Sequence, residues 1–213
     1  MSDVILHDYF RSSASYRVRI ALNLKGIAFH SHAVDLRTDE QQSAAYRDLN
    51  PQGFVPMLEM NGERLTQSLA IFDFLDAQVP EPPLVPRDPA DRAHVLALAL
   101  TVACDIHPLN NLRVLRYLKN QLGQPQQAID DWYRHWVTEG LAALEALAAP
   151  RAGRCLFGDE VTMADICLVP QLYNARRLKT LLDDFPTLTR VDGALTALPA
   201  FAAAHPDRQE SNP

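Results

Sequence analysis

A proline-rich segment divides this chain into two parts that differ in their pattern of apolar residues. Five of its fifteen prolines fall within the ten residues Pro80-Glu81-Pro82-Pro83-Leu84-Val85-Pro86-Arg87-Asp88-Pro89. Each proline removes a backbone hydrogen-bond donor and restricts the residue before it, so neither a helix nor a central strand passes through this segment. A chain of 213 residues is long enough for one or two domains. We expect two, at residues 1–82 and 90–213, joined by a semi-rigid linker at 83–89.

Before the linker, short apolar stretches alternate with helical patterns. The patterns predict strands at 4–6, 28–34, 55–60 and 64–66 and helices at 15–25 and 68–79. Gly26 is placed to end the first helix and Ser68 to cap the second. Asn61-Gly62 favours a two-residue type I′ hairpin, because both of its positions need positive φ. Residues 39–49 are ambiguous, and the order of the other elements predicts an α/β layer with a mixed sheet.

After the linker, no strand pair is recognisable and Ala/Leu-rich helical patterns predominate. The pattern at 90–121 predicts one or two long helices bent near Pro108. The pattern at 126–149 predicts another helix, and one side of it carries Ile129, Trp132, Trp136, Leu141, Leu144 and Leu147. Thr162-Met163-Ala164-Asp165 is a capping box, flanked by Val161 and Ile166 as a hydrophobic staple. The second domain is therefore expected to be all-helical.

Composition and charge exclude several classes of protein. The net charge is −6, from 26 acidic and 20 basic residues, and no cluster of Lys/Arg would attract a nucleic acid. Three cysteines without a CxxC pair argue against a disulfide framework and a structural zinc site, so no metal is expected. The N-terminus lacks the features of a signal peptide, and no stretch approaches the ~20 apolar residues of a membrane span. We expect a cytoplasmic protein that binds neither nucleic acid nor membrane.

Three serine hydroxyls lie between the first predicted strand and the start of the first predicted helix, at Ser12, Ser13 and Ser15, the first residue of that helix. A helix N-terminus at this point presents N–H groups and a partial positive charge, which suit an anion or a thiolate. The alternative is an ordinary serine-capped helix with surface arginines, and composition alone favours that alternative.

Two further turns have the composition of ligand-binding segments. In Asn50-Pro51-Gln52-Gly53-Phe54-Val55-Pro56, a cis Val55–Pro56 bond would expose the backbone of Val55 to a bound peptide, although a trans bond is the commoner form. Gln67-Ser68, at the next helix start, could hold a carboxylate through the hydroxyl and the backbone N–H groups. A plain helix cap is the alternative for this pair.

Four blocks of sequence occur together in one order and spacing, and this combination changes the interpretation. They are residues 12–22, 49–56, 67–71 and 158–165. With these blocks the chain resembles the zeta-class glutathione transferases over nearly its full length, including the proline linker, Asp105–Asn111 and Val169-Pro170-Gln171. The resemblance implies a thioredoxin-like N-terminal domain, an all-helical C-terminal domain, a homodimer, and glutathione bound in the cleft between the domains.

The resemblance also implies roles for individual residues. In that family the first serine of the motif, here Ser12 with Ser13 beside it, hydrogen-bonds the sulfur of glutathione and favours the thiolate. Val55 before a cis Pro56 pairs with the cysteinyl backbone, and the γ-glutamyl end is held by Gln67 and Ser68. Further positions that approach glutathione in the family correspond to Gln42, His107 and Asn111.

The implied reaction is glutathione-dependent cis–trans isomerisation of a maleyl-type diacid, with maleylacetoacetate of aromatic amino-acid breakdown as the first candidate. Addition of the thiolate to the double bond permits rotation, and its expulsion leaves the trans isomer. The forked donors of arginine suit the substrate carboxylates and the developing charge. Arg11 beside the serine motif and Arg176 and Arg177 on the capped helix are the candidates. Arg177 better matches the family's inward-facing arginine, and a solvated helix face is the alternative for Arg176.

One departure from the family pattern leaves the substrate open. Many members carry cysteine where this chain has Ala14, and the related maleylpyruvate isomerases also lack that cysteine. Maleylpyruvate isomerisation and general glutathione conjugation are therefore alternatives. A non-catalytic binding module of the same fold is an alternative of another class, and the presence of Ser12, Pro56, Gln67 and Ser68 together argues against it.

Overall fold

The computed structural model describes residues 4–209 and divides into two compact units. The first unit contains the chain up to Leu84 together with the segment from Ala197, and the second spans Val85–Thr196. The chain passes between the units within the predicted linker at 83–89. The C-terminal segment differs from the predicted domain 90–213, because it belongs to the first unit. Residues 1–3 and 210–213, which the predicted domain ranges include, lie outside the described residues.

The first unit is built on a four-stranded mixed sheet with the strand order β2-β1-β3-β4. Its strands are β1 (Ile5–Asp8), β2 (His30–Ala33), β3 (Met57–Met60) and β4 (Glu63–Thr66). β1 and β2 are parallel, whereas β1–β3 and β3–β4 are antiparallel. Asn61 and Gly62 join β3 to β4 with φ of 55° and 83°. The predicted mixed sheet and its tight hairpin are thereby confirmed.

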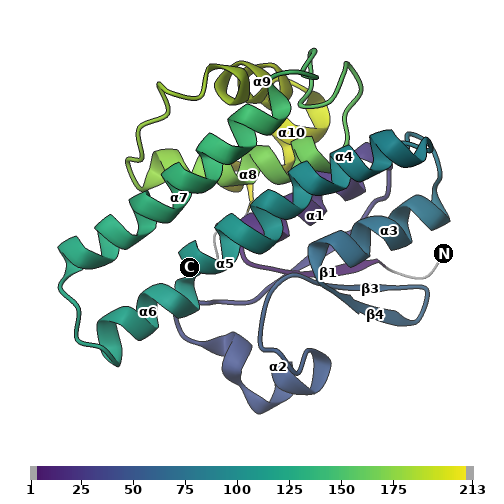
Figure 1. Ribbon diagram of the computed structural model, residues 1–213. Helices are drawn as coiled ribbons and strands as arrows, with labels where there is room; N and C mark the ends of the chain where they lie inside the picture. The colour runs from purple at the N-terminus through teal and green to yellow at the C-terminus, as the bar shows by residue number, and fades with distance from the viewer. Residues whose placement is uncertain (1–3, 210–213) are drawn as a thin grey trace. The chain divides into compact units, whose positions relative to one another are not determined.

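Helices cover both faces of this sheet, with α1 and α3 on one side and α2 on the other (Figure 1). They span α1 (Ser13–Leu24), α2 (Ala44–Leu49) and α3 (Ser68–Gln78), and the 3₁₀ turn η1 (Glu40–Gln42) precedes α2. Leu6 and Leu58 of the sheet, Ile20 of α1 and Phe72 of α3 are fully buried. Burial of apolar side chains from both layers supplies the main stabilisation of the unit.

The C-terminal segment packs on α1. It contains α10 (Pro199–Ala204) and the 3₁₀ turn η3 (Pro206–Arg208). Phe201 and Ala204 are buried, and Asn23 of α1 donates from Nδ2 to the carbonyl of Ala200 at 3.0 Å. Burial of Phe201 explains why this segment belongs to the first unit.

Two helix starts differ from their predictions. Helix α1 begins two residues earlier than predicted, because Oγ of Ser12 accepts a hydrogen bond from the Ser15 N–H at 3.2 Å and caps the helix. The prediction that Ser68 caps α3 is wrong by one residue. Gln67 occupies the cap position with φ of 67°, so Ser68 is the first helical residue.

The second unit is helical. Its elements are α4 (Pro89–Leu100), the π-helical segment η2 (Thr101–Ile106), α5 (His107–Asn110), α6 (Leu112–Asn120), α7 (Gln126–Ala148), α8 (Met163–Arg177) and α9 (Pro186–Thr196). In the described part of this unit the recorded β pairing is one isolated bridge between Ala152 and Gly158. The irregularity predicted near Pro108 consists of the π-helical segment directly before it and a break at Asn111. π-helical segments and prolines are common causes of bends in helices.

Helix α7 matches its predicted range within one residue, but its buried side differs. The buried residues are Ile129, Tyr133, Val137, Leu141, Leu144 and Ala148. Trp132 and Trp136, which the sequence placed on this side, are half-buried, and Leu147 is 54% exposed. Spacings of three and four residues keep the observed set on one helical face, whereas the predicted set drifts off it.

Helix α8 begins at the predicted capping box. Oδ2 of Asp165 accepts from the Thr162 N–H at 2.8 Å and from the Thr162 hydroxyl at 3.0 Å. Oδ1 of Asp165 accepts from the Leu156 N–H at 2.8 Å, which ties the preceding loop to the helix. The capping box is confirmed, and the helix continues as far as Arg177.

One helical run, Pro89–Asn120, is long and apolar enough to cross a membrane by length and composition alone. In that narrow sense the expectation that no stretch approaches a membrane span is wrong. The core helix of an ordinary helical domain meets the same criterion, and this run has buried residues inside the second unit, namely Val95, Leu98, Val102 and Ile106.

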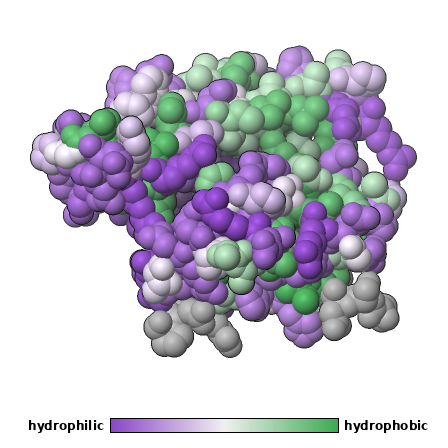
Figure 2. Space-filling model, turned by 90° about the horizontal axis from the view of Figure 1, so that it is seen from below, coloured by the Kyte–Doolittle hydropathy of each residue, from purple (hydrophilic) through white to green (hydrophobic). Residues whose placement is uncertain are grey.

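Hydrophilic residues cover much of the molecular face in Figure 2, with hydrophobic residues between them.

Candidate active site

Strand pairing in the first unit brings three predicted ligand-binding turns to one edge of the sheet. His7 of β1 pairs with Met57 of β3, and Met57 pairs with Thr66 of β4. The end of β1, the start of β3 and the end of β4 therefore lie side by side. The segments that adjoin these positions are the turn 9–12, the dipeptide 55–56 and the dipeptide 67–68.

Ser12 caps helix α1 at this edge. Its Oγ accepts from the Ser15 N–H, which leaves the hydroxyl proton to donate to a neighbouring anion. The first turn of α1 adds the partial positive charge of a helix N-terminus. Ser13 is buried and Arg11 is exposed, with its guanidinium carbon 4.9 Å from the ring centroid of Phe10. This corner can therefore stabilise a thiolate.

The Val55–Pro56 peptide bond is cis, as the family resemblance implies. The loop before it is held by the Tyr46 hydroxyl and by Nδ2 of Asn50, which both donate to the carbonyl of Phe54 at 2.7 Å. Two hydrogen bonds thus hold the backbone directly before Val55.

Gln42 belongs to the same loop system. Its Nε2 donates to the carbonyl of Gly53 at 3.2 Å, and its Oε1 accepts from Arg47. Gly53 has a φ of 63°, and a Cβ there would lie 2.9 Å from the carbonyl oxygen of Gln41, so a side chain would not fit. The structure therefore brings Gln42 to the loop that precedes Val55.

Gln67 and Ser68 lie at the start of α3. Gln67 is exposed, and its Nε2 donates to Oε1 of Gln52 at 2.9 Å, which joins this turn to the loop before Pro56. Ser68 is buried in the first turn of an eleven-residue helix. A hydroxyl beside backbone N–H groups at a helix N-terminus suits a carboxylate.

The second unit holds the remaining glutathione-binding candidates, His107 and Asn111. Nδ2 of Asn111 lies 3.3 Å from Nε2 of His107. Oδ1 of Asn111 accepts from the Arg113 N–H at 3.0 Å and caps α6. The structure therefore brings these two side chains together within their own unit.

The two arginines at the end of α8 have different surroundings. Nη2 of Arg176 lies 2.6 Å from Oδ2 of Asp192, a buried carboxylate on α9. Burial raises the pKa of Asp192 and the charge of Arg176 opposes that rise. Arg176 therefore holds α8 to α9, which disfavours its predicted role in substrate binding. Arg177 is exposed.

Tyr133, on α7, is a residue that the sequence analysis missed. Its side chain is buried, and its hydroxyl has no hydrogen-bond partner among residues 4–209. Burial raises the pKa of Tyr133, and the positive charge of Arg177 opposes that rise. A cavity of about 250 Å³ beside it is lined by α6 and α7, with Arg116 and Lys119 among the lining residues. The sequence signal was the spacing of four from Ile129.

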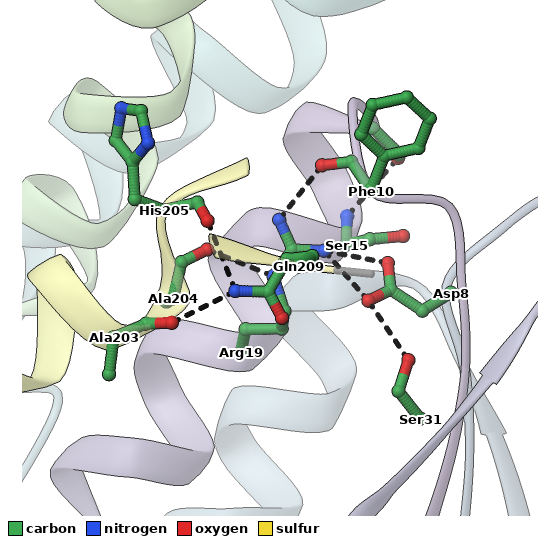
Figure 3. A network of polar contacts seen from close by, with 10 residues as sticks. Asp8, Phe10, Ser15, Arg19, Ser31, Ala203, Ala204, His205 and Gln209 are labelled. Carbon is green, nitrogen blue, oxygen red and sulfur yellow. Dashed lines mark hydrogen bonds and ion pairs between the residues drawn. The ribbon is translucent and has the colours of Figure 1, made fainter. Parts of the chain in front are cut away.

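Arg19 and Asp8 form a buried ion pair that the sequence analysis also missed (Figure 3). The alternative of surface arginines on the first helix is wrong, because Arg17 is 2% and Arg19 is 0% exposed. The available signal was the position of both arginines among the apolar residues of α1, with Asp8 at the end of the preceding strand.

The chemistry of the donors at the sheet edge fits glutathione. The hydroxyl of Ser12 and the N-terminus of α1 suit its sulfur in the thiolate form, and Ser68 with the N-terminus of α3 suits a carboxylate. Within the described range, no group of three His, Cys, Asp or Glu side chains is placed to hold a metal ion. The three cysteines are free thiols, with Cys104 exposed and the other two buried.

Comparison with known proteins identifies the family. Residues 11–78 match the model of the glutathione S-transferase N-terminal domain, and residues 126–191 match the model of the C-terminal domain. The chain belongs to the glutathione S-transferase family, and its structural neighbours are of the zeta class, as the resemblance predicted.

Several similar relatives within that family are named isomerases. The chain is 46% identical to a probable maleylacetoacetate isomerase of Vibrio cholerae over 98% of both chains. A solved maleylpyruvate isomerase, described as a bacterial zeta-class glutathione transferase, shares 44% identity and a TM-score of 0.95 over 98% of this chain and 100% of that one. The maleylacetoacetate isomerase of Anaeromyxobacter dehalogenans, solved with glutathione in its active site, shares 46% identity and a TM-score of 0.89 over 99% of this chain and 98% of that one.

Proposed function

We propose that this protein is a glutathione-dependent cis–trans isomerase of a maleyl-type diacid, with maleylacetoacetate as its substrate. The observation that carries the proposal is the placement of Ser12. Its hydroxyl oxygen caps α1 and its proton is left to donate, at the sheet edge that also carries the cis Val55–Pro56 bond and the Gln67-Ser68 turn. Relatives with 41–47% identity are named maleylacetoacetate or maleylpyruvate isomerase.

Bound glutathione would supply the thiolate whose reversible addition to the double bond lowers the barrier to rotation. Ser12 and the N-terminus of α1 hold the sulfur in its anionic form. The Val55 backbone holds the cysteinyl part, and Gln67 and Ser68 hold the γ-glutamyl end, with Gln42, His107 and Asn111 as further contacts. These residues orient the nucleophile.

Arginine side chains bind the diacid and stabilise the negative charge that develops on its carbonyl oxygen. The protein carries a net charge of −6, so long-range attraction does not collect a dianion and a local cation is required. Arg177 is the first candidate, because Arg176 is engaged with Asp192. Arg11, exposed beside the serine motif, is the second.

Maleylpyruvate is the alternative substrate. Ala14 removes the motif cysteine, and a relative from Ralstonia with 45% identity is named maleylpyruvate isomerase. Because glutathione itself supplies the sulfur, neither reaction needs a protein thiol at position 14.

We further propose that the protein is a cytoplasmic homodimer that acts in aromatic amino-acid breakdown. One helix face supports self-association: Ala93, Ala97 and Leu100 of α4 are exposed at spacings of four and three residues. Sedimentation analysis should give a dimer for the natural protein and a monomer for Leu100→Glu. A monomeric natural protein would exclude the homodimer.

The decisive experiment is a substrate panel with and without glutathione, in which cis-to-trans conversion is followed by NMR. The protein is first dialysed and checked for bound thiol. We expect conversion of a maleyl-type diacid only when glutathione is present, and maleylacetoacetate should be turned over faster than maleylpyruvate. Full activity without glutathione would reject the mechanism, and the opposite order of rates would reassign the substrate.

A further inference from the structure

Arg19 joins three segments of the first unit through its guanidinium group. Nη1 donates to both carboxylate oxygens of Asp8 at 2.7 Å, Nη2 donates to the carbonyl of Phe10 at 3.1 Å, and Nε donates to the carbonyl of Ala204 at 3.0 Å. Figure 3 shows these groups converging on one side chain. All three guanidinium nitrogens are therefore committed in a fully buried environment.

The contact of Arg19 with the Phe10 carbonyl bears on the proposed thiolate site. Phe10 lies two residues before Ser12, and the Ser12 N–H donates to the carbonyl of Tyr9 at 2.8 Å. The turn 9–12 is thus held at its Phe10 carbonyl by Arg19 and is closed by its own backbone. Any displacement of that carbonyl moves the backbone that carries the Ser12 hydroxyl.

The contact of Arg19 with the Ala204 carbonyl joins it to the C-terminal segment. Ala204 is 185 residues from Arg19, and it ends α10, whose Phe201 is fully buried. Nε2 of Gln209 donates to the carbonyls of Ala203 and His205 at 2.9 and 3.0 Å, so the chain after α10 folds back on its end (Figure 3). The C-terminal segment therefore presents a fixed carbonyl to Arg19.

We propose that Arg19 is a positioning residue for the Ser12 thiolate site, and that the C-terminal segment contributes to this positioning through its contact with Arg19. The inference rests on the proposed binding of glutathione at Ser12. Arg19 itself does not touch the sulfur, because its three nitrogens are bound to Asp8, Phe10 and Ala204.

The geometry of the group explains why arginine is required. A guanidinium offers donors in a rigid planar fork, whereas an ammonium is a point charge on a flexible stem. Lysine at position 19 would keep the charge opposite Asp8 but could not hold the Phe10 and Ala204 carbonyls at their present angles. A shift of about 1 Å in a catalytic group is enough to cost about a hundredfold in rate.

The test compares Arg19→Lys with a matched change at the other end of the same helix. The side chain of Lys25 is as deeply buried as that of Arg19. Its Nζ lies 2.6 Å from Oδ1 of Asp76 and donates to the carbonyls of Val79 and Pro82, and Lys25 follows the last residue of α1. It is thirteen residues from Ser12, roughly 20 Å along a helix. Lys25→Met should therefore destabilise the unit without moving the thiolate site.

The readout is the pKa of glutathione bound to the whole protein, followed by the ultraviolet absorbance of the thiolate. We expect Arg19→Lys to raise this pKa by about one unit, a tenfold loss of thiolate at pH values below the pKa. Lys25→Met should leave it unchanged. An unchanged pKa in folded Arg19→Lys, or an equal rise in both variants, would overturn the inference.

A second variant tests the C-terminal link and does not depend on the folding of Arg19→Lys. Phe201→Leu loosens α10 against α1 and leaves every side chain near Ser12 in place. This variant should also raise the pKa of bound glutathione, by a smaller amount than Arg19→Lys. If the pKa does not change, the C-terminal segment has no part in positioning the site. If the natural protein itself does not lower the pKa of bound glutathione, the proposed function fails, which is a separate result.

Discussion

Arg176 and Asp192 form an ion pair of 2.6 Å between Nη2 and Oδ2, and this contact separates the roles of two adjacent arginines. The carboxylate is buried on α9, whereas Arg177 is exposed at the end of α8. The first arginine is engaged in holding two helices together, and the second is the candidate for the substrate.

We expect Arg177→Lys to impair use of the diacid more than use of glutathione. Lysine keeps the charge but loses the fork that matches a carboxylate, and Arg177→Ala should impair the reaction further. Steady-state kinetics with each substrate varied separately measure this. Unchanged kcat/KM for the diacid in both variants would eliminate Arg177 and leave Arg11 as the candidate.

Arg176→Ala is expected to act on stability instead. It leaves the buried Asp192 carboxylate without its partner. The guanidinium is half-exposed and partly screened, so we expect a loss of about 1–3 kcal/mol, less than for a fully buried pair. Denaturant unfolding measures the loss, and KM for the diacid should not change. A raised KM with normal stability would instead return Arg176 to the substrate site.

Ser12→Ala should raise the pKa of bound glutathione and slow turnover. A hydrogen bond to a charged group contributes about 1.5–3 kcal/mol, and one unit of pKa corresponds to about 1.4 kcal/mol. The variant also loses the cap of α1, at a cost of about 0.5–2 kcal/mol in stability.

Ser43→Ala is the matched control for the lost cap. Ser43 caps α2 by accepting from the Tyr46 N–H at 3.2 Å, the same distance as in the Ser12 cap. It should lower stability by a similar amount and leave the thiol pKa unchanged. An identical thiol pKa in Ser12→Ala and the natural protein would assign the role to Ser13 or to backbone N–H groups.

Asp165 should make stability depend on pH in the weakly acidic range. Burial raises its pKa from 3.8 to about 6, against the opposing effect of its hydrogen bonds from Leu156 and Thr162. Between these values the folded state binds more protons than the unfolded state, so stability falls as the pH rises from about 4 to 6. A shift of about two units corresponds to about 3 kcal/mol.

Asp165→Asn removes this titration. The difference in the free energy of unfolding between the natural protein and the variant should therefore be largest near pH 4 and smaller above pH 6. Denaturant unfolding at each pH measures this difference. The affinity for glutathione per folded molecule should change little, since the carboxylate serves the capping box. A difference that is constant across the range would contradict the raised pKa.

Tyr133→Phe and Tyr46→Phe should differ in stability although both remove one buried hydroxyl. The Tyr133 hydroxyl has no partner among the described residues, so its removal should leave stability unchanged or slightly raised. The Tyr46 hydroxyl donates to the Phe54 carbonyl at 2.7 Å, so its removal should cost about 0.5–1.5 kcal/mol. Equal losses in thermal unfolding would show that the Tyr133 hydroxyl does make a stabilising contact.

Features that depend on local chemistry were predictable from the sequence. Asn61-Gly62 specifies its hairpin because both positions need positive φ, and Thr162 with Asp165 specifies the start of α8 because the two residues satisfy each other's backbone groups. The prolines of 80–89 exclude a helix or a central strand for the same local reason, and the chain first passes from one unit to the other within this segment. The four blocks of sequence identified the family, and the resemblance predicts the roles of Ser12, Val55 and Gln67-Ser68.

Features that depend on partners far apart in the chain became visible only in the folded structure. The family pattern favours Arg177 over Arg176, but the physical reason for the difference is the position of Asp192 on α9. The helical pattern alone predicts Arg19 as a surface residue, whereas in the folded chain its guanidinium is bound to Asp8, Phe10 and Ala204. The C-terminal segment follows a helical domain in sequence, yet burial of Phe201 on α1 places it in the first unit. Burial and long-range pairing are properties of the packed chain, and for that reason the sequence pattern alone did not contain them.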